Sequence, residues 1–199
     1  MIVLVDNTKN LQKAFMTPLL VDILKKKNIE FKIVSDINDV NYVVDNFKKK
    51  IKAIILSGGP MNLSDNLAMS LINKNITILL RLRNIPVLGI CFGFQLLCSI
   101  YGSKIVKMNE EIQGKYKLKF DNKSKLFKNM NKTEYLTYQN HKDKVLDKPN
   151  GFKIISMNEN NTIEAIENEE EKIYGTQFHP EALEETSEII YNFIDICYI

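Results

Sequence analysis

The stretch that most constrains this chain is residues 84–98, which read NIPVLGICFGFQLLC. An apolar run that includes Gly89 follows Pro86, and a second run that suits a helix follows Gly93. The pattern predicts a buried strand, a sharp turn and a helix, with Cys91 at the apex of the turn. Glycines on both sides of a strained apex let neighbouring backbone pass without a Cβ clash.

Cys91 would therefore stand at the amino end of a helix. That end carries partial positive charge and free N–H groups, which favour a thiolate and can bind a developing oxyanion. The position predicts a nucleophilic cysteine. A single buried cysteine is more often an inert core residue, and this is how we interpret Cys98 and Cys197. The nucleophile hypothesis consequently needs a base elsewhere in the chain.

Length and composition narrow the class of protein. At 199 residues, the chain suits one sizeable core, and we expect residues 1–199 to form one domain. A formal net charge of +3 does not indicate nucleic acid, and neither a leader nor a membrane-length apolar run is present in the sequence. Three cysteines without a paired framework favour a reducing, cytoplasmic location. We expect no metal site and no cofactor, because the histidines and cysteines lack close paired spacing.

The first half of the chain alternates between buried apolar runs and segments with helical spacing. The predicted strands are 2–6, 30–34, 53–57 and 85–90, and the predicted helices are 11–27, 40–50 and 67–82. Such βα units form a parallel sheet with helices on both faces. Ligands collect at the carboxyl ends of parallel strands, where Asp6, Gly58, Gly59 and Cys91 would all lie.

The second half has shorter apolar pieces separated by turn residues. The predicted strands there are 104–108, 115–120, 134–138, 152–157, 162–167 and 172–178, and a final helix is predicted over 183–194. The expected fold class is therefore α/β, with a mostly parallel sheet flanked by helices and a smaller antiparallel addition in the C-terminal half.

The run Tyr174-Gly175-Thr176-Gln177-Phe178-His179-Pro180-Glu181 supplies a candidate base. Pro180 would end the strand beside His179, and the carboxylate of Glu181 could hydrogen-bond the imidazole and fix its tautomer. A cysteine nucleophile needs such a base, and the base needs an orienting group. The chain offers one other histidine, His141, and the Pro180-Glu181 context beside His179 is what distinguishes the two. His179 is the better candidate.

Four blocks together resemble the class I glutamine amidotransferases, the Cys-His-Glu glutaminases. They are ILSGGP (55–60), PVLGICFGFQLL (86–97), YQNHKDKV (138–145) and IYGTQFHPEA (173–182), in the family's order. The resemblance covers essentially the whole chain. It implies a flavodoxin-like sheet, hydrolysis of L-glutamine to glutamate and ammonia, Cys91 as the nucleophile that forms a thioester, His179 as general base and acid, and Glu181 as its orienting group.

The same resemblance implies further site residues. The backbone N–H groups of Gly59 and Phe92 match the family's oxyanion hole, where donors act on charge as it develops. Gln95 matches a position that helps to hold the substrate glutamine. The segment 138–143, expected to be a loop, would contact the substrate through its backbone, which makes Asn140 and His141 candidate substrate-binding residues.

Within the family, SGGP, the run 141–145 and IYGTQFHPE most closely resemble the amidotransferase component of GMP synthases. The chain has no ATP-pyrophosphatase signature, so this resemblance implies that ammonia passes to a separate synthetase, for GMP synthesis from XMP. Some positions depart from the family pattern: residues 6–10 lack a glycine and an aromatic residue, and Phe94 replaces a His or Met.

Two other functions stay open from the sequence. The same catalytic residues could hydrolyse a γ-glutamyl peptide or conjugate, with water as the only acceptor. Alternatively, the chain could be a glutaminase-like binding or regulatory subunit with weak activity, which the altered first loop favours and the intact triad opposes.

Overall fold

The structure is a computed structural model that describes residues 1–8, 16–65 and 69–198. The start of the first predicted helix, 11–15, and the first two residues of the helix predicted from 67 lie outside the described residues. Within the described part, a seven-stranded sheet has the strand order β2-β1-β3-β4-β9-β8-β7, and β5 and β6 form a separate two-stranded sheet. The strands are β1 (Ile2–Val5), β2 (Phe31–Val34), β3 (Ala53–Leu56), β4 (Val87–Ile90), β5 (Ile105–Leu118), β6 (Tyr135–Val145), β7 (Lys153–Met157), β8 (Ile163–Asn168) and β9 (Ile173–Thr176).

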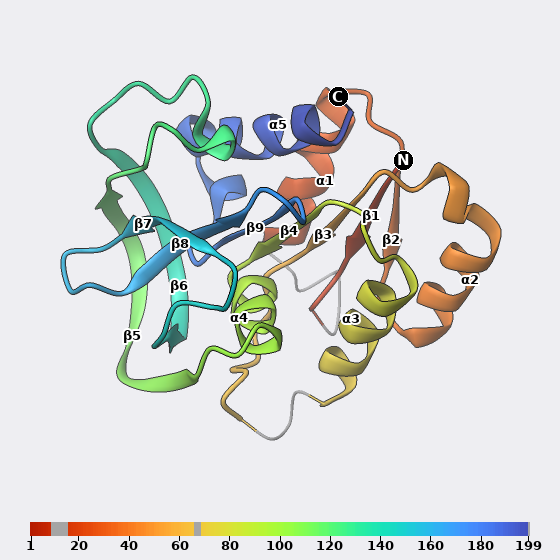
Figure 1. Cartoon of the computed structure of the whole chain (residues 1–199), viewed down its shortest axis with the longest axis horizontal. Coiled ribbons are helices and arrows are strands. Elements are labelled where there is room, and N and C mark those ends of the chain that lie inside the picture. The colour runs from red at the N-terminus through yellow and green to blue at the C-terminus, as the bar shows by residue number, and fades with distance from the viewer. Residues whose placement is uncertain (9–15, 66–68, 199) are drawn as a thin grey trace.

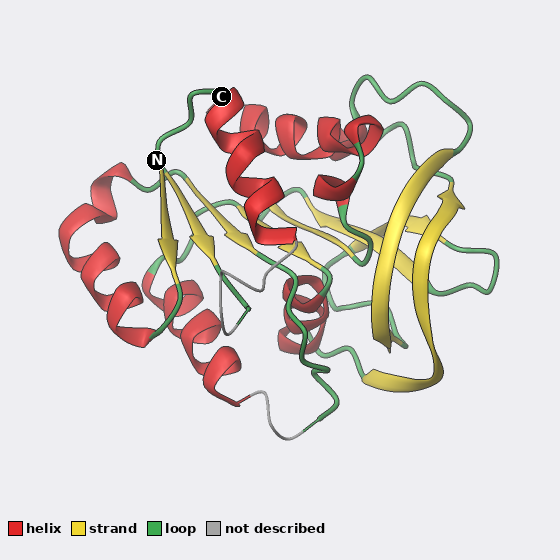
Figure 2. Cartoon of the chain, turned by 180° about the vertical axis from the view of Figure 1, so that it is seen from behind, coloured by secondary structure: helices red, strands yellow, loops and turns green. Residues whose placement is uncertain are grey.

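Helices cover both faces of the large sheet, as Figures 1 and 2 show. One face carries α1 and α5, and the other carries α2, α3 and α4. The helices are α1 (Met16–Lys26), α2 (Ile37–Phe47), α3 (Met69–Arg81), α4 (Phe92–Ile100) and α5 (Glu184–Tyr198). Over the described residues, no helix combines the length and apolar character needed to cross a membrane.

Alternating strand residues supply the two hydrophobic cores. In β3, Ile55 packs into the core under α1 and α5, while Ile54 and Leu56 pack into the core under α2, α3 and α4. The same alternation occurs in β1, whose four residues are all buried. Burial of each such aliphatic side chain contributes roughly 1.5–3 kcal/mol. Within the large sheet, β2, β1, β3, β4 and β9 run parallel to one another, and β8 and β7 continue the sheet as antiparallel strands, so the predicted α/β fold class with a mostly parallel sheet is confirmed.

The second predicted helix begins earlier in the structure than in the sequence analysis. We expected it over 40–50, but α2 covers Ile37–Phe47 and a short 3₁₀ turn follows at Lys48–Lys50. Asp36 caps the helix, because its side chain accepts hydrogen bonds from the backbone N–H groups of Asn38 and Asp39 at 2.8 and 2.9 Å. The N-cap therefore decides where this helix starts.

The prediction of a loop over 138–143 is wrong, because these residues lie in β6. Every second residue of β6 is buried, which is the period of a strand, but the buried set includes Thr137, Gln139, His141 and Asp143. Because these buried positions are polar, the segment lacks the apolar alternation by which a strand is predicted from sequence. The two pieces predicted at 104–108 and 115–120 are likewise one strand, β5, interrupted by a register shift between Lys107 and Ile112.

Glycines at the β4–α4 junction allow backbone to approach backbone. A Cβ atom at Gly93 would clash with the carbonyl oxygen and Cβ of Leu56 in β3, and one at Gly89 would lie 2.7 Å from the carbonyl oxygen of Gly93. The start of α4 therefore sits directly against β3 and β4. This contact fixes the position of Cys91 between the strand and the helix, as the sequence pattern predicts.

We expect Gly93→Ala to lower the free energy of unfolding by about 1–3 kcal/mol, because the added methyl group forces α4 away from Leu56. Urea denaturation followed by circular dichroism measures the change. Ser99→Ala, at an exposed position of the same helix, is the matched control and should change stability little. An equal stability for Gly93→Ala and the control would contradict the close approach described here.

Candidate active site

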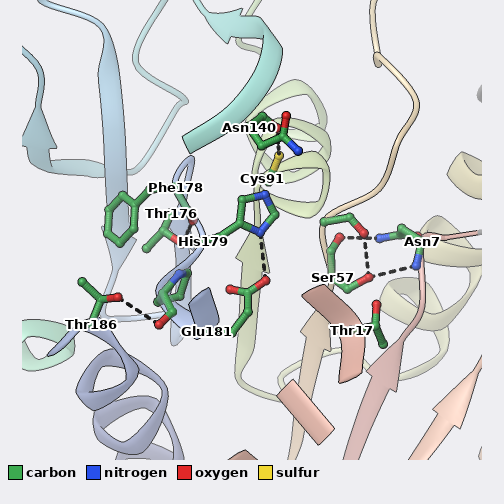
Figure 3. Close-up of polar contacts among 12 residues, drawn as sticks. Asn7, Thr17, Ser57, Cys91, Asn140, Thr176, Phe178, His179, Glu181 and Thr186 are labelled. Atoms are coloured by element: carbon green, nitrogen blue, oxygen red, sulfur yellow. Dashed lines mark hydrogen bonds and ion pairs between the residues drawn. The ribbon is translucent and has the colours of Figure 1, made fainter. Parts of the chain in front are cut away.

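The residues that follow β3, β4 and β9 meet at the carboxyl ends of these strands. From the sequence we expected this of Gly58, Gly59 and Cys91, together with Asp6 after the first strand. A methyl group at Gly58, just after β3, would lie 2.7 Å from Cε1 of His179 and 3.5 Å from Cβ of Cys91. His179 follows β9, and Cys91 follows β4. Figure 3 shows the imidazole of His179 between Cys91 and Glu181. The structure therefore brings the predicted nucleophile, base and glycine turn into one place.

Cys91 has a strained backbone and a fixed position. Its φ of 50° and ψ of −103° are unusual for a residue with a side chain, and the residue is the N-cap of α4. The Cys91 N–H donates to the carbonyl oxygen of Thr176 in β9 at 2.8 Å. The thiol faces the carbonyl oxygen of Asn140 in β6, 3.7 Å from the sulfur. Contacts from two different sheets thus hold this residue at the start of the helix.

His179 and Glu181 form a buried pair. Nδ1 of His179 lies 2.9 Å from Oε1 of Glu181, and both side chains are at most 5% exposed. The backbone N–H of His179 donates to the carbonyl oxygen of Tyr138 at 2.8 Å, which ties the residue to β6. Because Nδ1 is engaged by the carboxylate, Nε2 is the ring nitrogen left for the contact with Cys91.

The surroundings of His179 favour its charged form. Burial alone would lower the pKa of the imidazole, but the charges of Glu181 and Cys91, together with hydrogen bonds to both, raise it well above 6.5. The second oxygen of Glu181, Oε2, is buried and has no hydrogen-bond partner among the described residues. Protonated His179 therefore compensates a carboxylate that is otherwise poorly solvated.

A cavity of about 310 Å³ opens beside Cys91. Each site residue that the sequence analysis assigned to the oxyanion hole or the substrate contributes to its wall. The wall consists of Gly59, Pro60, Met61, Asn62, Cys91, Phe92, Gln95, Glu111, Asn140, His141, Lys142 and Asp143. In the sequence, Glu111 lies on a polar stretch without a distinguishing pattern, and Lys142 and Asp143 stand out only as members of the block 138–145, with no role of their own.

His141 is a buried strand residue, which corrects its interpretation as a loop residue. Its Nδ1 lies 2.8 Å from the carbonyl oxygen of Asp143, so Nδ1 carries the proton that this bond requires. Nε2 is buried without a hydrogen-bond partner in the described structure. Burial lowers the pKa of this imidazole, so His141 is the neutral histidine of the site.

The side chains of Gln95 and Asp143 hold parts of the cavity wall together. The amide nitrogen of Gln95 donates to the carbonyl oxygen of Asp143 and to Oε1 of Gln177, each at 3.1 Å. The carboxylate of Asp143 accepts from the N–H and hydroxyl of Ser64 at 2.8 and 2.7 Å. Gln95 therefore links α4 to β6, and Asp143 links β6 to the loop that follows the glycine turn.

A second, larger cavity of about 580 Å³ lies at the amino ends of β4 and β9. Its wall is mainly apolar and includes Leu79, Ile100 and Tyr101, but none of the predicted catalytic residues. The smaller cavity holds the polar groups and the strained cysteine, so it is the candidate active site. Among the described side chains, no group of three His, Cys, Asp or Glu residues is placed to hold a metal ion.

This arrangement suits acyl transfer through a covalent intermediate. The predicted nucleophile, Cys91, lies at a helix amino terminus, His179 stands beside it, and the buried carboxylate of Glu181 contacts that histidine. The chain belongs to the class I glutamine amidotransferases, since the family model described as "Glutamine amidotransferase class-I" matches residues 4–196.

Relatives within that family carry a narrower description. A glutamine-hydrolysing GMP synthase subunit of Methanococcus aeolicus is 34% identical over 178 residues, which are 87% of this chain and 88% of that protein. The "GMP synthase [glutamine-hydrolyzing]" of Clostridium kluyveri is 36% identical over 173 residues, 84% of this chain. The chain spans only 32% of that longer relative.

Solved structures show the same fold. The structure of a putative GMP synthase subunit from Thermoplasma acidophilum has a TM-score of 0.80 and 26% sequence identity, and covers 99% of this chain and 93% of its own. A glutamine amidotransferase from Thermotoga maritima has a TM-score of 0.72 at 20% identity, over 98% of this chain and 82% of its own. The latter likeness concerns the fold alone.

The two histidines should titrate on opposite sides of pH 6.5, with His141 below and His179 well above. Glu181→Gln should lower only the pKa of His179, because the substitution removes the neighbouring negative charge. Because the folded-state pKa of His179 is raised, the stability that its protonation contributes is present below pH 6.5 and is lost as the pH rises through that raised pKa.

Proton NMR of the two Cε1–H signals measures both pKa values, and His141→Asn assigns them. A His179 signal that titrates below pH 6.5 in the unsubstituted protein would contradict the electrostatics described above.

Proposed function

We propose that the chain hydrolyses L-glutamine to glutamate and ammonia, with Cys91, His179 and Glu181 as the catalytic triad. The observation that carries this proposal is the contact set at Cys91, where a strained helix-terminal cysteine meets a histidine that a buried carboxylate orients. Family membership supports the same reaction.

In the first half of the reaction, the Cys91 thiolate adds to the side-chain amide carbon of glutamine. A C–S bond forms, and the carbonyl electron pair moves onto oxygen. The N–H groups of Gly59 and Phe92 bind this oxyanion, a contribution that reaches about 2.7–4 kcal/mol for one well-placed donor. His179 then gives its proton to the nitrogen, the C–N bond breaks, and ammonia leaves a thioester behind.

In the second half, water attacks the thioester. Neutral His179 takes a proton from the water, the oxyanion forms again, and collapse breaks the C–S bond to release glutamate. Glu181 keeps Nδ1 of His179 engaged throughout, so that Nε2 performs both transfers. Each group therefore returns to its starting state.

The cavity wall suits a zwitterionic amino acid. Glu111 and Lys142 supply one negative and one positive side chain to the same wall as Cys91, which complements the α-ammonium and α-carboxylate of glutamine. Gln95, Asn140 and His141 complete the proposed substrate contacts. Because Gln95 already holds Asp143, its role includes shaping the cavity as well as touching the ligand.

The ammonia acceptor is part of the proposal. Relatives named as glutamine-hydrolysing subunits of GMP synthase match this chain over most of both lengths, which favours a separate ATP-pyrophosphatase synthetase that aminates XMP to GMP. We also propose that residues 1–199 act as one amidotransferase domain and that the protein works in the cytoplasm, a location that three free cysteines suit.

Ammonia release from glutamine should depend on Cys91 and should increase when the synthetase subunit, XMP and ATP are added. Cys91→Ser should abolish the release, because a serine hydroxyl at this position is a far weaker nucleophile than a thiolate. Glu181→Gln should reduce kcat less severely, since the imidazole stays in place. An assay coupled to glutamate dehydrogenase, which consumes the released ammonia, measures the rate.

Circular dichroism is the control that Cys91→Ser keeps its fold. Cys91→Ser protein with full activity would overturn the proposed nucleophile. Rapid hydrolysis of γ-glutamyl peptides with little release from free glutamine, with or without the partner, would overturn glutamine as the substrate.

A further inference from the structure

A buried polar chain leads from α3 to the glycine turn, and the proposed reaction does not account for it. Its members are Lys74 and Asn75 on α3, Asn7 after β1, and Ser57 at the end of β3. All four are at most 2% exposed. A buried lysine is expensive to desolvate, so its presence so close to the site needs an explanation.

The chain begins at the Lys74 ammonium. Its Nζ donates to the carbonyl oxygen of Asp6 and, at 2.9 Å, to that of Ser35. Burial lowers the pKa of Lys74, and the nearby carboxylates of Asp6, Asp36 and Asp39 oppose that fall. The ammonium thus fixes the direction of the Asp6 carbonyl group.

The peptide between Asp6 and Asn7 passes this orientation on. In a trans peptide the C=O and the following N–H point in opposite directions, and no cis peptide occurs in the described residues. The Asn7 N–H therefore points away from Lys74, and it donates to Oγ of Ser57 at 2.9 Å. The Asn7 side chain reinforces this contact by donating to the Ser57 carbonyl oxygen at 2.9 Å.

The Ser57 hydroxyl continues the chain of hydrogen bonds from the Asn7 peptide to the Gly58 peptide. It accepts from Asn7 and donates to the carbonyl oxygen of Gly58 at 2.8 Å. Figure 3 shows these contacts of Asn7 and Ser57. With the Gly58 carbonyl held in this direction, the N–H of Gly59 must point the opposite way. The backbone of Gly59 also packs directly against Asn7, because a Cβ atom at Gly59 would lie 2.6 Å from the Asn7 carbonyl oxygen.

We propose that Lys74, Asn7 and Ser57 form a hydrogen-bond relay that holds the Gly59 N–H in the orientation needed to bind the oxyanion. The relay rests on the proposed glutaminase function, and its members are positioning residues that do not touch the substrate. Bonds in such a chain polarise one another, so the ammonium at one end strengthens the donor at the other. Asn75 steadies the middle, since its side-chain nitrogen donates to Oδ1 of Asn7 at 2.6 Å.

Ser57→Ala tests the last step, because it removes the hydroxyl that holds the Gly58 carbonyl group. An oxyanion donor is worth about 10²–10³ in kcat, so a donor that is no longer oriented should cost about tenfold or more. KM should change little, because the ground-state substrate has no oxyanion. Ser156→Ala is the matched control: its buried hydroxyl donates to the Lys119 carbonyl oxygen at 2.9 Å, and kcat should stay at the unsubstituted value.

Alkylation by iodoacetamide separates positioning from general damage. That reaction forms no oxyanion, so its rate at Cys91, followed by mass spectrometry, should be unchanged in Ser57→Ala. Lys74→Met should also lower kcat, and the double variant should be no slower than Ser57→Ala alone, because residues in series are not additive. Ser57→Ala tests the relay by itself even if Lys74→Met does not fold.

Ammonia release is measured with the synthetase subunit present, for the unsubstituted chain and for each variant. Loss of kcat in Ser57→Ala, with KM and alkylation retained, supports the relay. If the unsubstituted chain is active and Ser57→Ala keeps kcat within about twofold of it, the loss is far smaller than that expected for an oxyanion donor. That result would overturn the relay and leave the proposed function standing. Equal losses of kcat and alkylation would also overturn it, in favour of a general structural role. An inactive unsubstituted chain would overturn the proposed function and the relay with it.

Discussion

The structure depends on the close backbone approach between α4 and strands β3 and β4. Gly93 packs against the backbone of Leu56, so the helix must begin immediately after β4. Cys91 is left between the two elements with a φ of 50°, and its position follows from buried strands that cannot shift independently. The proposed nucleophile is therefore placed by buried, closely packed elements, and the other groups of the site come from elsewhere in the chain.

Strand β6 brings much of the site to that point. Its backbone accepts a hydrogen bond from His179 through Tyr138 and faces the Cys91 sulfur through Asn140, while Asp143 anchors the loop that contains Ser64. The small sheet thus aligns the proposed nucleophile and the proposed base, which follow different strands of the large sheet. The glycine turn is held from the other side by the chain through Asn7 and Ser57.

The sequence predicts the parallel sheet and the position of Cys91 in it well. The βα alternation and the β4–turn–α4 pattern give the parallel sheet and the place of Cys91, because burial on both faces produces continuous apolar runs. The pairing of His179 with Glu181 follows from two residues of separation and an intervening proline. The full extent of strand β6 could not be predicted, since buried polar residues such as Gln139 and Asp143 interrupt its apolar alternation.

By itself the sequence determined the local geometry: a cysteine at a strand-to-helix turn, a histidine beside a carboxylate, and a glycine pair after a buried strand. Only the tertiary structure decided which distant groups meet. The contacts of Cys91 with Asn140, and of Lys74 with the loop after β1, join residues 49 and 68 positions apart. Such contacts follow from strand order and helix packing, which no local pattern encodes, and polar groups buried by them have no periodic signature.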